Sequence, residues 1–598
     1  MAAVVCLLSM PAAAQQAGDL TDEEVEDVIR LVRIAGLSIK EPPERSRAFA
    51  GLVAAQLMRG KFQQAMKEMR NVRTRLWQAR TQIHIADYQQ RKGRGKLVRE
   101  ALNKALKLVP TKQRPLGTDT TLREVAMRRA RMGNFADARR IVQRMGTRMG
   151  KIQSIFEIVE LQKKSPDRKV VKGAAKSYSE IFKLAKGVDA EPAIKAALFV
   201  DIVKAQAAIQ DSAGAEVTLN HLKAFLDKNK FDGRDDFVAE LAGAYVLAGD
   251  LNTPMALVRS IGNEANRAMA MASVAGAIGR NGDIDSAVPL FDLAFGDAKI
   301  LQKPKARYKV LRHIAEQQTL IGLTADAFAT AGWIRDREAQ ANALFGMAQG
   351  LIARNKYKDL ILLADFISHI GMRAIMFSTA ALVKGHAGDR MGASALLAQG
   401  LKDSGYKGEP VMLVEGLRRT IDVQSKVGAV EALESLVKRI EVLAGRLKDQ
   451  LPKAGVMTQL ARAQARAGLS DAANTSLAIA WRLAWSNKED PGFADSMAEI
   501  VNAQLLAGSI LQAFDTAARV PEAAAAPKQT NTGLPGIVPD DIVETAKQKA
   551  LRLVAIAAAR LARPKLSIRA ARQIEDTAAR AKALADIAVA VAKVGPQS

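Results

Sequence analysis

Side chains that commonly carry out catalysis are sparse and scattered in this sequence. The five histidines are His84, His221, His313, His369 and His386, and most of them lack a nearby carboxylate. The sequence contains no HExxH motif, which zinc proteases of that class need, and no GxSxG nucleophile turn. Cys6 is the single cysteine, which excludes a disulfide framework and a cysteine-rich metal site. We therefore predict that the chain is not an enzyme and that it binds no metal or cofactor.

Two short motifs resemble functional sequences but are incomplete. Residues 93–96 read GRGK, like part of a phosphate-binding loop, but they lack the Walker spacing and the Ser or Thr after the lysine. The pattern SxxK occurs at Ser404 and at Ser435, without the KTG and SDN motifs that accompany it in serine acyl-enzymes. We interpret both as chance matches.

The basic residues offer a different chemistry, the binding of an anion. The 598 residues include 88 Lys and Arg against 62 Asp and Glu, a net charge of +26. Residues 51–180 hold 31 basic and 10 acidic residues, so +21 of the charge lies there, and one run is Arg91, Lys92, Arg94, Lys96 and Arg99. Such a concentration favours an anionic partner. The alternative is that these charges only keep an alanine-rich chain in solution.

The elements that position these residues are indicated by an internal repeat. Eight glycines mark turns between two expected helices: Gly60, Gly133, Gly249, Gly282, Gly322, Gly388, Gly468 and Gly508. Seven residues before them stand Val53, Ala126, Ala242, Ala275, Ala315, Ala381, Ala461 and Val501. Five residues after them stand Ala65, Ala138, Pro254, Ala287, Ala327, Ala393, Ala473 and Ala513. Weaker copies centre on Gly93, Asn355 and Gly428, and the spacings of 33 and 40 predict a two-helix repeat.

The physical reason for this pattern is the packing of two antiparallel helices. Glycine ends the first helix because it adopts a left-handed conformation without strain, and the small residues on either side let the helices approach closely. Neither helix can bury its apolar stripe alone, so each pair must stack on the next. We predict an all-α fold of about a dozen stacked pairs.

One copy of the repeat carries a family resemblance: Met271, Val274, Ala275, Ile278, Gly282, Ala287, Phe291 and Ala294. It resembles the tetratricopeptide repeat (TPR), although Ile278, Gln56 and Arg129 stand where that family has an aromatic residue in the first helix. The resemblance covers nearly all of the chain after its first residues. It implies a degenerate, TPR-like, right-handed superhelical α-solenoid, and a scaffold for protein–protein interaction.

The resemblance also implies which basic residues face a partner. In TPR proteins the first helix of each pair lines the concave surface, and by position from the loop glycine four arginines face inward: Arg80, Arg91, Arg123 and Arg131. We predict that they bind the anionic partner.

A second set of basic residues recurs fifteen positions before the loop glycine: Arg45, Arg234, Arg267, Arg307, Arg373 and Lys453. Because it runs along the whole array, we interpret this position as structural, bonding the carbonyl groups at the end of the preceding helix or a neighbouring carboxylate.

The chain divides by composition into five parts. We expect a signal peptide at 1–14, a basic N-terminal part of the solenoid at 15–180, and central repeats at 181–520. A loop with several prolines and glycines follows at 521–540, and capping helices at 541–598. The six acidic residues between Asp19 and Asp27 suit the first turn of a helix.

The N-terminal residues predict export. An apolar stretch from Ala2 to Met10 precedes Pro11 and three alanines, which is typical of a signal peptide cleaved before Gln15. The stretch lacks a positive start, and a greasy N-terminus without that role is the alternative. No later segment has the roughly 18 uninterrupted apolar residues of a membrane span. We expect a periplasmic protein.

Three functions are compatible with the sequence. The first is a periplasmic scaffold that binds an acidic protein segment, lipid head groups or an anionic envelope polymer through its basic N-terminal third. The second is a helical-repeat nucleic-acid-binding protein, which the scarcity of aromatic residues among the basic clusters disfavours. The third is an accessory subunit of a cell-envelope or cell-wall enzyme.

Overall fold

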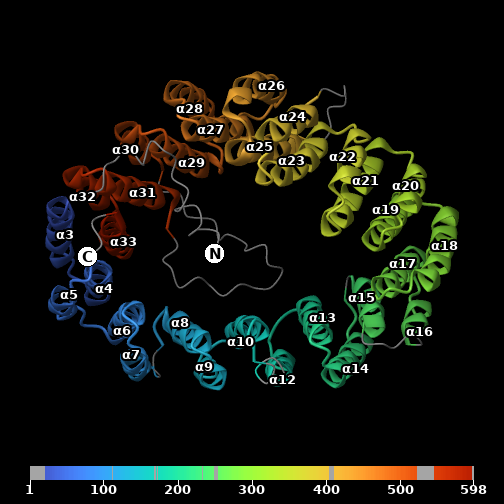
Figure 1. Ribbon diagram of the computed structural model, residues 1–598, viewed down its shortest axis with the longest axis horizontal. Coiled ribbons are helices and arrows are strands. Elements are labelled where there is room, and N and C mark those ends of the chain that lie inside the picture. The colour runs from blue at the N-terminus through green and yellow to red at the C-terminus, as the bar shows by residue number, and fades with distance from the viewer. Residues whose placement is uncertain are drawn as a thin grey trace. The chain divides into compact units, whose positions relative to one another are not determined.

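The computed structural model is all-α, as the sequence predicts (Figure 1). It describes residues 20–110, 112, 114–167, 170, 173–231, 233–247, 253–402, 410–521 and 544–594. Within these ranges there are α-helices and one 3-10 turn at Val430–Ala432, and no strand. The expected signal peptide at 1–14 and nearly all of the expected loop at 521–540 lie outside the described residues.

The chain forms two compact units, and the first of them joins the N-terminal and C-terminal parts of the sequence. Unit 1 contains the described residues up to Gly146 and those from Glu441 onward. Its helices are α3 (Asp22–Leu37), α4 (Pro42–Met58), α5 (Phe62–Met69), α6 (Arg75–Arg91), α7 (Gly95–Leu108), α8 (Thr118–Arg131), α9 (Phe135–Val142), α27 (Gln450–Arg466), α28 (Ser470–Trp485), α29 (Phe493–Leu506), α30 (Ile510–Arg519), α31 (Ala546–Arg560), α32 (Pro564–Arg572) and α33 (Thr577–Val594).

Unit 2 contains the residues from Thr147 to Ile440. Its helices are α10 (Arg148–Lys163), α12 (Ala174–Lys186), α13 (Pro192–Ala208), α14 (Ser212–Lys228), α15 (Arg234–Leu247), α16 (Thr253–Arg259), α17 (Glu264–Arg280), α18 (Ile284–Ile300), α19 (Pro304–Ile321), α20 (Thr324–Gly332), α21 (Arg337–Ala353), α22 (Tyr357–Asp365), α23 (Ile370–His386), α24 (Arg390–Gly400) and α25 (Pro410–Val427). The boundary between the units falls inside α26 (Leu433–Gly445).

Both units are built from the predicted helix pair. Seven of the eight strong-copy glycines are described, and all seven have a positive φ, from 75° at Gly60 to 99° at Gly322. Of the weaker copies, Gly93 and Asn355 share this conformation, whereas Gly428 does not. Gly249 lies outside the described residues. The small residues seven before and five after these turns are completely buried, as Ala275 and Ala287 illustrate. The two-helix repeat is confirmed, and the chain has an all-α fold built of repeated antiparallel helix pairs.

A buried glutamine is a further mark of the repeat. It stands four residues before the turn, where the TPR pattern has an aromatic residue, and in three pairs its side chain accepts a hydrogen bond from a buried hydroxyl twelve residues later. The three bonds are Thr218 to Gln206 (2.9 Å), Thr330 to Gln318 (2.9 Å) and Ser476 to Gln464 (2.8 Å). These bonds link the two helices of a pair and satisfy the buried carbonyl oxygen of each glutamine side chain.

The recurring basic position is structural, as predicted, at three of its six residues, Arg45, Arg234 and Arg373. Arg45 donates to the carbonyl oxygen of Ile39 (2.7 Å) and Arg234 to that of Leu226 (2.8 Å), in each case at the end of the preceding helix. Arg373 is 7% exposed and donates to the carbonyl oxygens of Ile367 (3.5 Å) and Gly400 (3.3 Å). These arginines satisfy carbonyl groups that a helix end leaves without partners.

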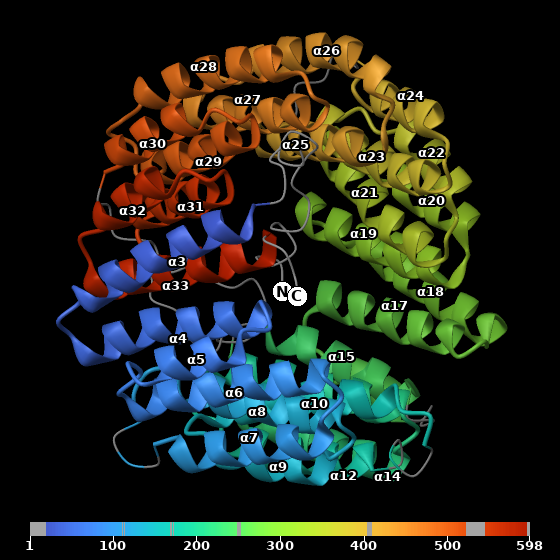
Figure 2. The ribbon, with the colours of Figure 1, turned by 60° about the vertical axis from the view of Figure 1, so that its left-hand side comes forward.

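The first and last helices that the structure describes pack against each other in unit 1. Helix α33 lies between α31 and α4, and α3 packs on α33, α32 and α4 (Figures 1 and 2). Helix α3 therefore occupies the place of the second helix in a pair whose first helix is α33. The contact is close, because a Cβ atom on Gly51 would lie 2.4 Å from the Cα atom of Ala585.

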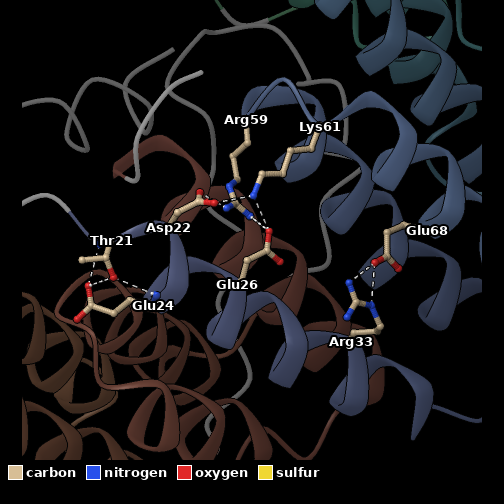
Figure 3. A network of polar contacts seen from close by, with 8 residues as sticks. All are labelled: Thr21, Asp22, Glu24, Glu26, Arg33, Arg59, Lys61 and Glu68. Atoms are coloured by element: carbon tan, nitrogen blue, oxygen red, sulfur yellow. Dashed lines mark hydrogen bonds and ion pairs between the residues drawn. The ribbon is translucent and has the colours of Figure 1, made fainter.

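Ion pairs hold α3 to α4 and α5 (Figure 3). The side chain of Arg59 is 1% exposed and pairs with Asp22 and with Glu26, the latter at 2.7 Å. Lys61 pairs with the same two carboxylates at 2.8 Å, and Arg33 donates from Nε to Glu68 at 2.7 Å. The acidic N-terminal segment thus does more than begin a helix, although Thr21 and Glu24 do form a capping box there.

Candidate functional site

A cluster of charged and polar residues joins the first helices α6 and α8. Arg128 of α8 donates two hydrogen bonds to the carboxylate of Asp87 on α6, both at 2.7 Å. Arg80 of α6 donates from Nε to the hydroxyl of Thr121 on α8 at 3.1 Å. These residues, with His84 and Glu124, form the α6–α8 cluster. Its residues recur at intervals of three to four along each helix, so they share one face.

Burial perturbs the titration of this cluster. It lowers the pKa of His84 to about 4, and the nearby charges of Arg128 and Arg80 add to that effect while Asp87 opposes it. Burial also raises the pKa of Glu124, although Arg128 and Arg80 favour its charged form. A histidine with so low a pKa is neutral near pH 7, so the cluster presents guanidinium donors and a neutral imidazole.

The row of polar and charged side chains continues from α6 onto α4, α33 and α31. The guanidinium groups of Arg47 on α4 and Arg80 on α6 lie 5.3 and 4.7 Å from the centre of the Trp77 ring. Beyond Arg47, α31 and α33 meet through Arg552, which bonds Glu544 at 2.8 Å and Asp586 at 3.0 Å. Five first helices, α31, α33, α4, α6 and α8, therefore carry a row of mostly paired charges.

The four arginines predicted to bind the partner do not share one environment. Arg80 and Arg123 are half-buried near the starts of α6 and α8, and Arg80 is bonded to Thr121 as described. Arg91 and Arg131 end those helices and are exposed, and Arg91 donates to the carbonyl oxygen of Leu57 at the end of α4 (3.2 Å). Within each helix the two arginines are about 12 to 17 Å apart along the axis. The structure brings Arg80 toward α8 but does not gather the four into one site.

A group of basic residues without carboxylate partners lies close to the α6–α8 cluster, on the turn between α6 and α7 and on the exposed face of α7. Residues 91–107 contain seven exposed basic residues and one exposed carboxylate, Glu100. The basic residues are Arg91, Lys92, Arg94, Lys96, Arg99, Lys104 and Lys107. We call this the α6–α7 basic surface. None of its basic side chains forms an ion pair within the part of the chain that the structure describes. The run of basic residues at 91–99 already marked it in the sequence, but assignment by TPR position selected only Arg91.

The described residues offer no arrangement that indicates catalysis. Within them, no three His, Cys, Asp or Glu side chains lie close enough together to hold a metal ion. His313 has a hydroxyl partner, Ser273 Oγ, at 2.8 Å from its Nε2 atom. The absence of enzymatic activity stays a prediction.

Comparison with known proteins yields structural neighbours only. No family model and no curated protein matches the chain. Among solved structures it is similar to the Naa15/Naa10 complex bound to HypK-THB, at 15% identity and a TM-score of 0.28 over 83% of this chain and 75% of that one. It is also similar to the APC/C hetero-tetramer Cut9-Hcn1, at 12% identity and 0.18 over 82% and 95%. A third is the STAND protein with a tetratricopeptide repeat sensor from Pyrococcus horikoshii, at 11% identity and 0.19 over 74% and 63%. The fold assignment rests on the helix pairs of this chain itself.

No helix within the described ranges has the length and apolar composition needed to cross a membrane.

Proposed function

We propose that this chain is an exported helical-repeat scaffold whose basic N-terminal third binds an anionic partner. The observation that carries the proposal is the α6–α7 basic surface, where seven exposed cations face one carboxylate. Such a surface raises the local concentration of anions and speeds their association. The positive charges of the neighbouring α6–α8 cluster are largely neutralised by ion pairs within that cluster. An anion is therefore attracted most strongly to the α6–α7 turn and to the exposed face of α7.

The chemistry of the surface favours an acidic protein segment as the partner. Single-stranded nucleic acids are usually held by aromatic side chains that stack on the bases, and α7 contains no aromatic residue. Trp77 is already flanked by Arg47 and Arg80, and Tyr88 stacks on Phe62 with ring centres 5.5 Å apart. Lysine and arginine in a row suit carboxylates along a flexible acidic chain.

Charge reversal on this surface tests the proposal. The variant carries Lys92→Glu, Arg94→Glu, Lys96→Glu and Arg99→Glu, and the matched control reverses four exposed lysines elsewhere: Lys358, Lys402, Lys488 and Lys565. Both change the net charge equally. Binding of a fluorescein-labelled 20-residue polyglutamate peptide, followed by anisotropy, should weaken at least tenfold in the variant and much less in the control. An equal loss in both would show that only the net charge matters.

Two further measurements separate the alternatives. A labelled 20-nucleotide poly(U) that binds more tightly than the peptide at 150 mM salt would favour the nucleic-acid-binding function instead. Charge reversal at Arg80, Arg91, Arg123 and Arg131 tests the inward-facing arginines, and a larger loss there than on the α6–α7 basic surface would move the site to the first helices.

The location is a separate part of the proposal and depends on the sequence of the first residues. We propose a periplasmic protein whose mature form begins at Gln15. N-terminal sequencing of the protein from a periplasmic extract tests this directly. An uncleaved chain found in the cytoplasm would contradict it.

A further inference from the structure

The second-helix side of unit 2 exposes aromatic and aliphatic side chains in a row. Trp333, at the end of α20, is 52% exposed, and Phe366, at the end of α22, is 72% exposed. Edge-to-face contacts connect successive helices, Phe295 of α18 with Trp333 and Phe328 of α20 with Phe366, with ring centres 5.7 and 6.1 Å apart. Connected apolar groups on a surface mark an interaction site more often than scattered ones do.

A pocket of about 240 Å³ opens between α18 and α20 within this row. Phe291, which is 1% exposed, lies among its lining residues with Val288, Phe295, Leu323 and Trp333. Its size is below the range of roughly 300 to 1,000 Å³ that is usual for small-molecule sites. The volume suits an anchoring side chain from another protein better than a free ligand.

Two carboxylates belong to the same pocket. Asp292 of α18 and Asp326 of α20 are exposed, and within the described part of the chain neither side chain makes an ion pair or a hydrogen bond. At the aromatic edge the ammonium group of Lys299 lies 5.2 Å from the centre of the Phe295 ring and 4.6 Å from that of Trp333. The pocket thus combines an apolar floor with a local excess of negative charge, in a chain whose net charge is +26.

We propose that the α18–α20 pocket docks an amphipathic helix of a partner protein that presents a large apolar side chain flanked by lysine or arginine. The apolar side chain enters between Phe291 and Trp333, and the cations of the helix pair with Asp292 and Asp326. The occupant is therefore opposite in charge to the one that the α6–α7 basic surface attracts, so this site is additional to the proposed function. Charge complementarity sets both the preference and the orientation.

The probe is a fluorescein-labelled 14-residue peptide of leucine and lysine whose sequence gives one apolar face on a helix. A scrambled peptide of the same composition without such a face is its control. Because the protein as a whole repels a cationic peptide, saturable binding reports a local site. We expect the amphipathic peptide to bind the full-length chain and the scrambled one to bind at least tenfold more weakly.

Three variants locate the binding. Asp292→Asn with Asp326→Asn removes the two charges without changing the fold, and should weaken binding about tenfold. Trp333→Ser should weaken it similarly. Because the Trp333 side chain is 52% exposed, we expect this variant to fold, which a thermal melt checks. Lys299→Met removes the competing cation and should strengthen binding.

Several results would overturn this proposal. They are the absence of saturable binding, equal binding of the scrambled peptide, and affinities that none of the three variants changes. A fourth is concentration-dependent dimerisation of the chain that Trp333→Ser abolishes, because a second copy would then cover the pocket.

Discussion

Units 1 and 2 use the same helix pair, but their two candidate binding surfaces leave charges of opposite sign without ion-pair partners. In both units the alanine five residues after the turn is completely buried, as Ala65 and Ala287 show. The α6–α7 basic surface of unit 1 leaves cations unpaired, whereas the α18–α20 pocket of unit 2 leaves Asp292 and Asp326 unpaired beside exposed aromatic rings. The repeat thus determines the interior, and we propose that a few surface positions determine which partner chemistry each unit accepts.

The largest difference in stability between the two units should come from substitutions at close helix–helix contacts. A side chain at Gly51 would meet the backbone of Ala585 in α33, with a Cβ to Cα distance of 2.4 Å, and backbone atoms cannot move aside cheaply. We expect Gly51→Val to destabilise unit 1 by about 3 kcal/mol or more. Hydrogen exchange measured by mass spectrometry should increase in α3, α4 and α33 and remain unchanged in α18 to α24.

The matched substitution in unit 2 is Gly371→Val. A Cβ atom there would lie 2.1 Å from the carbonyl oxygen of Met412, so exchange should increase in α23 and α25 instead. Gly296→Ala is the neutral control, since a Cβ atom at Gly296 meets no atom within 4 Å. If Gly51→Val left α33 protected, the packing of the chain ends would be contradicted.

A smaller difference should appear on acidification. The pKa of His84 is about 4 in the folded chain and about 6.5 in an unfolded one, so between these values only the unfolded chain binds the proton. Unit 1 therefore loses stability as the pH falls from 6.5 to 4, by up to about 1.4 kcal/mol per pH unit. His84→Gln should flatten the dependence of Tm on pH in that window. The control is His386→Gln, at an exposed position of unit 2; a similar flattening there would contradict the assignment to His84.

The smallest effect concerns the buried glutamine. Gln464→Leu leaves the hydroxyl of Ser476, which is 3% exposed, without its 2.8 Å hydrogen bond. We expect a loss of about 1–2 kcal/mol in the free energy of unfolding, and a partial recovery when Ser476→Ala is added. Denaturant unfolding of the single and double variants measures both. Additive losses would show that the pair does not interact.

The sequence predicted the repeat because its signals are local. A glycine at the turn and small residues at fixed distances from it depend only on the geometry of one helix pair. The role of Arg45, Arg234 and Arg373 also followed, since a helix end always leaves carbonyl groups to be satisfied.

The surfaces were less predictable because they depend on contacts between separate pairs. Asp87 and Arg128 are 41 residues apart, and nothing in either segment shows that they neutralise each other. Charge counts therefore could not separate Arg128 from Lys92. The Gln–hydroxyl spacing of twelve was present in the sequence, and a search for recurring polar residues before the turn would have found it.

The contact between α33 and α4 has a consequence for how the chain is made. The ribosome completes α4 about 520 residues before it begins α33, which at 5 to 20 residues per second takes roughly half a minute to two minutes. During that time the faces of α3 and α4 that α33 later covers have no native neighbour, so they are available to chaperones or to the wrong helices of the growing array. Helices α3 and α4 are thus synthesised long before the helix that completes their packing.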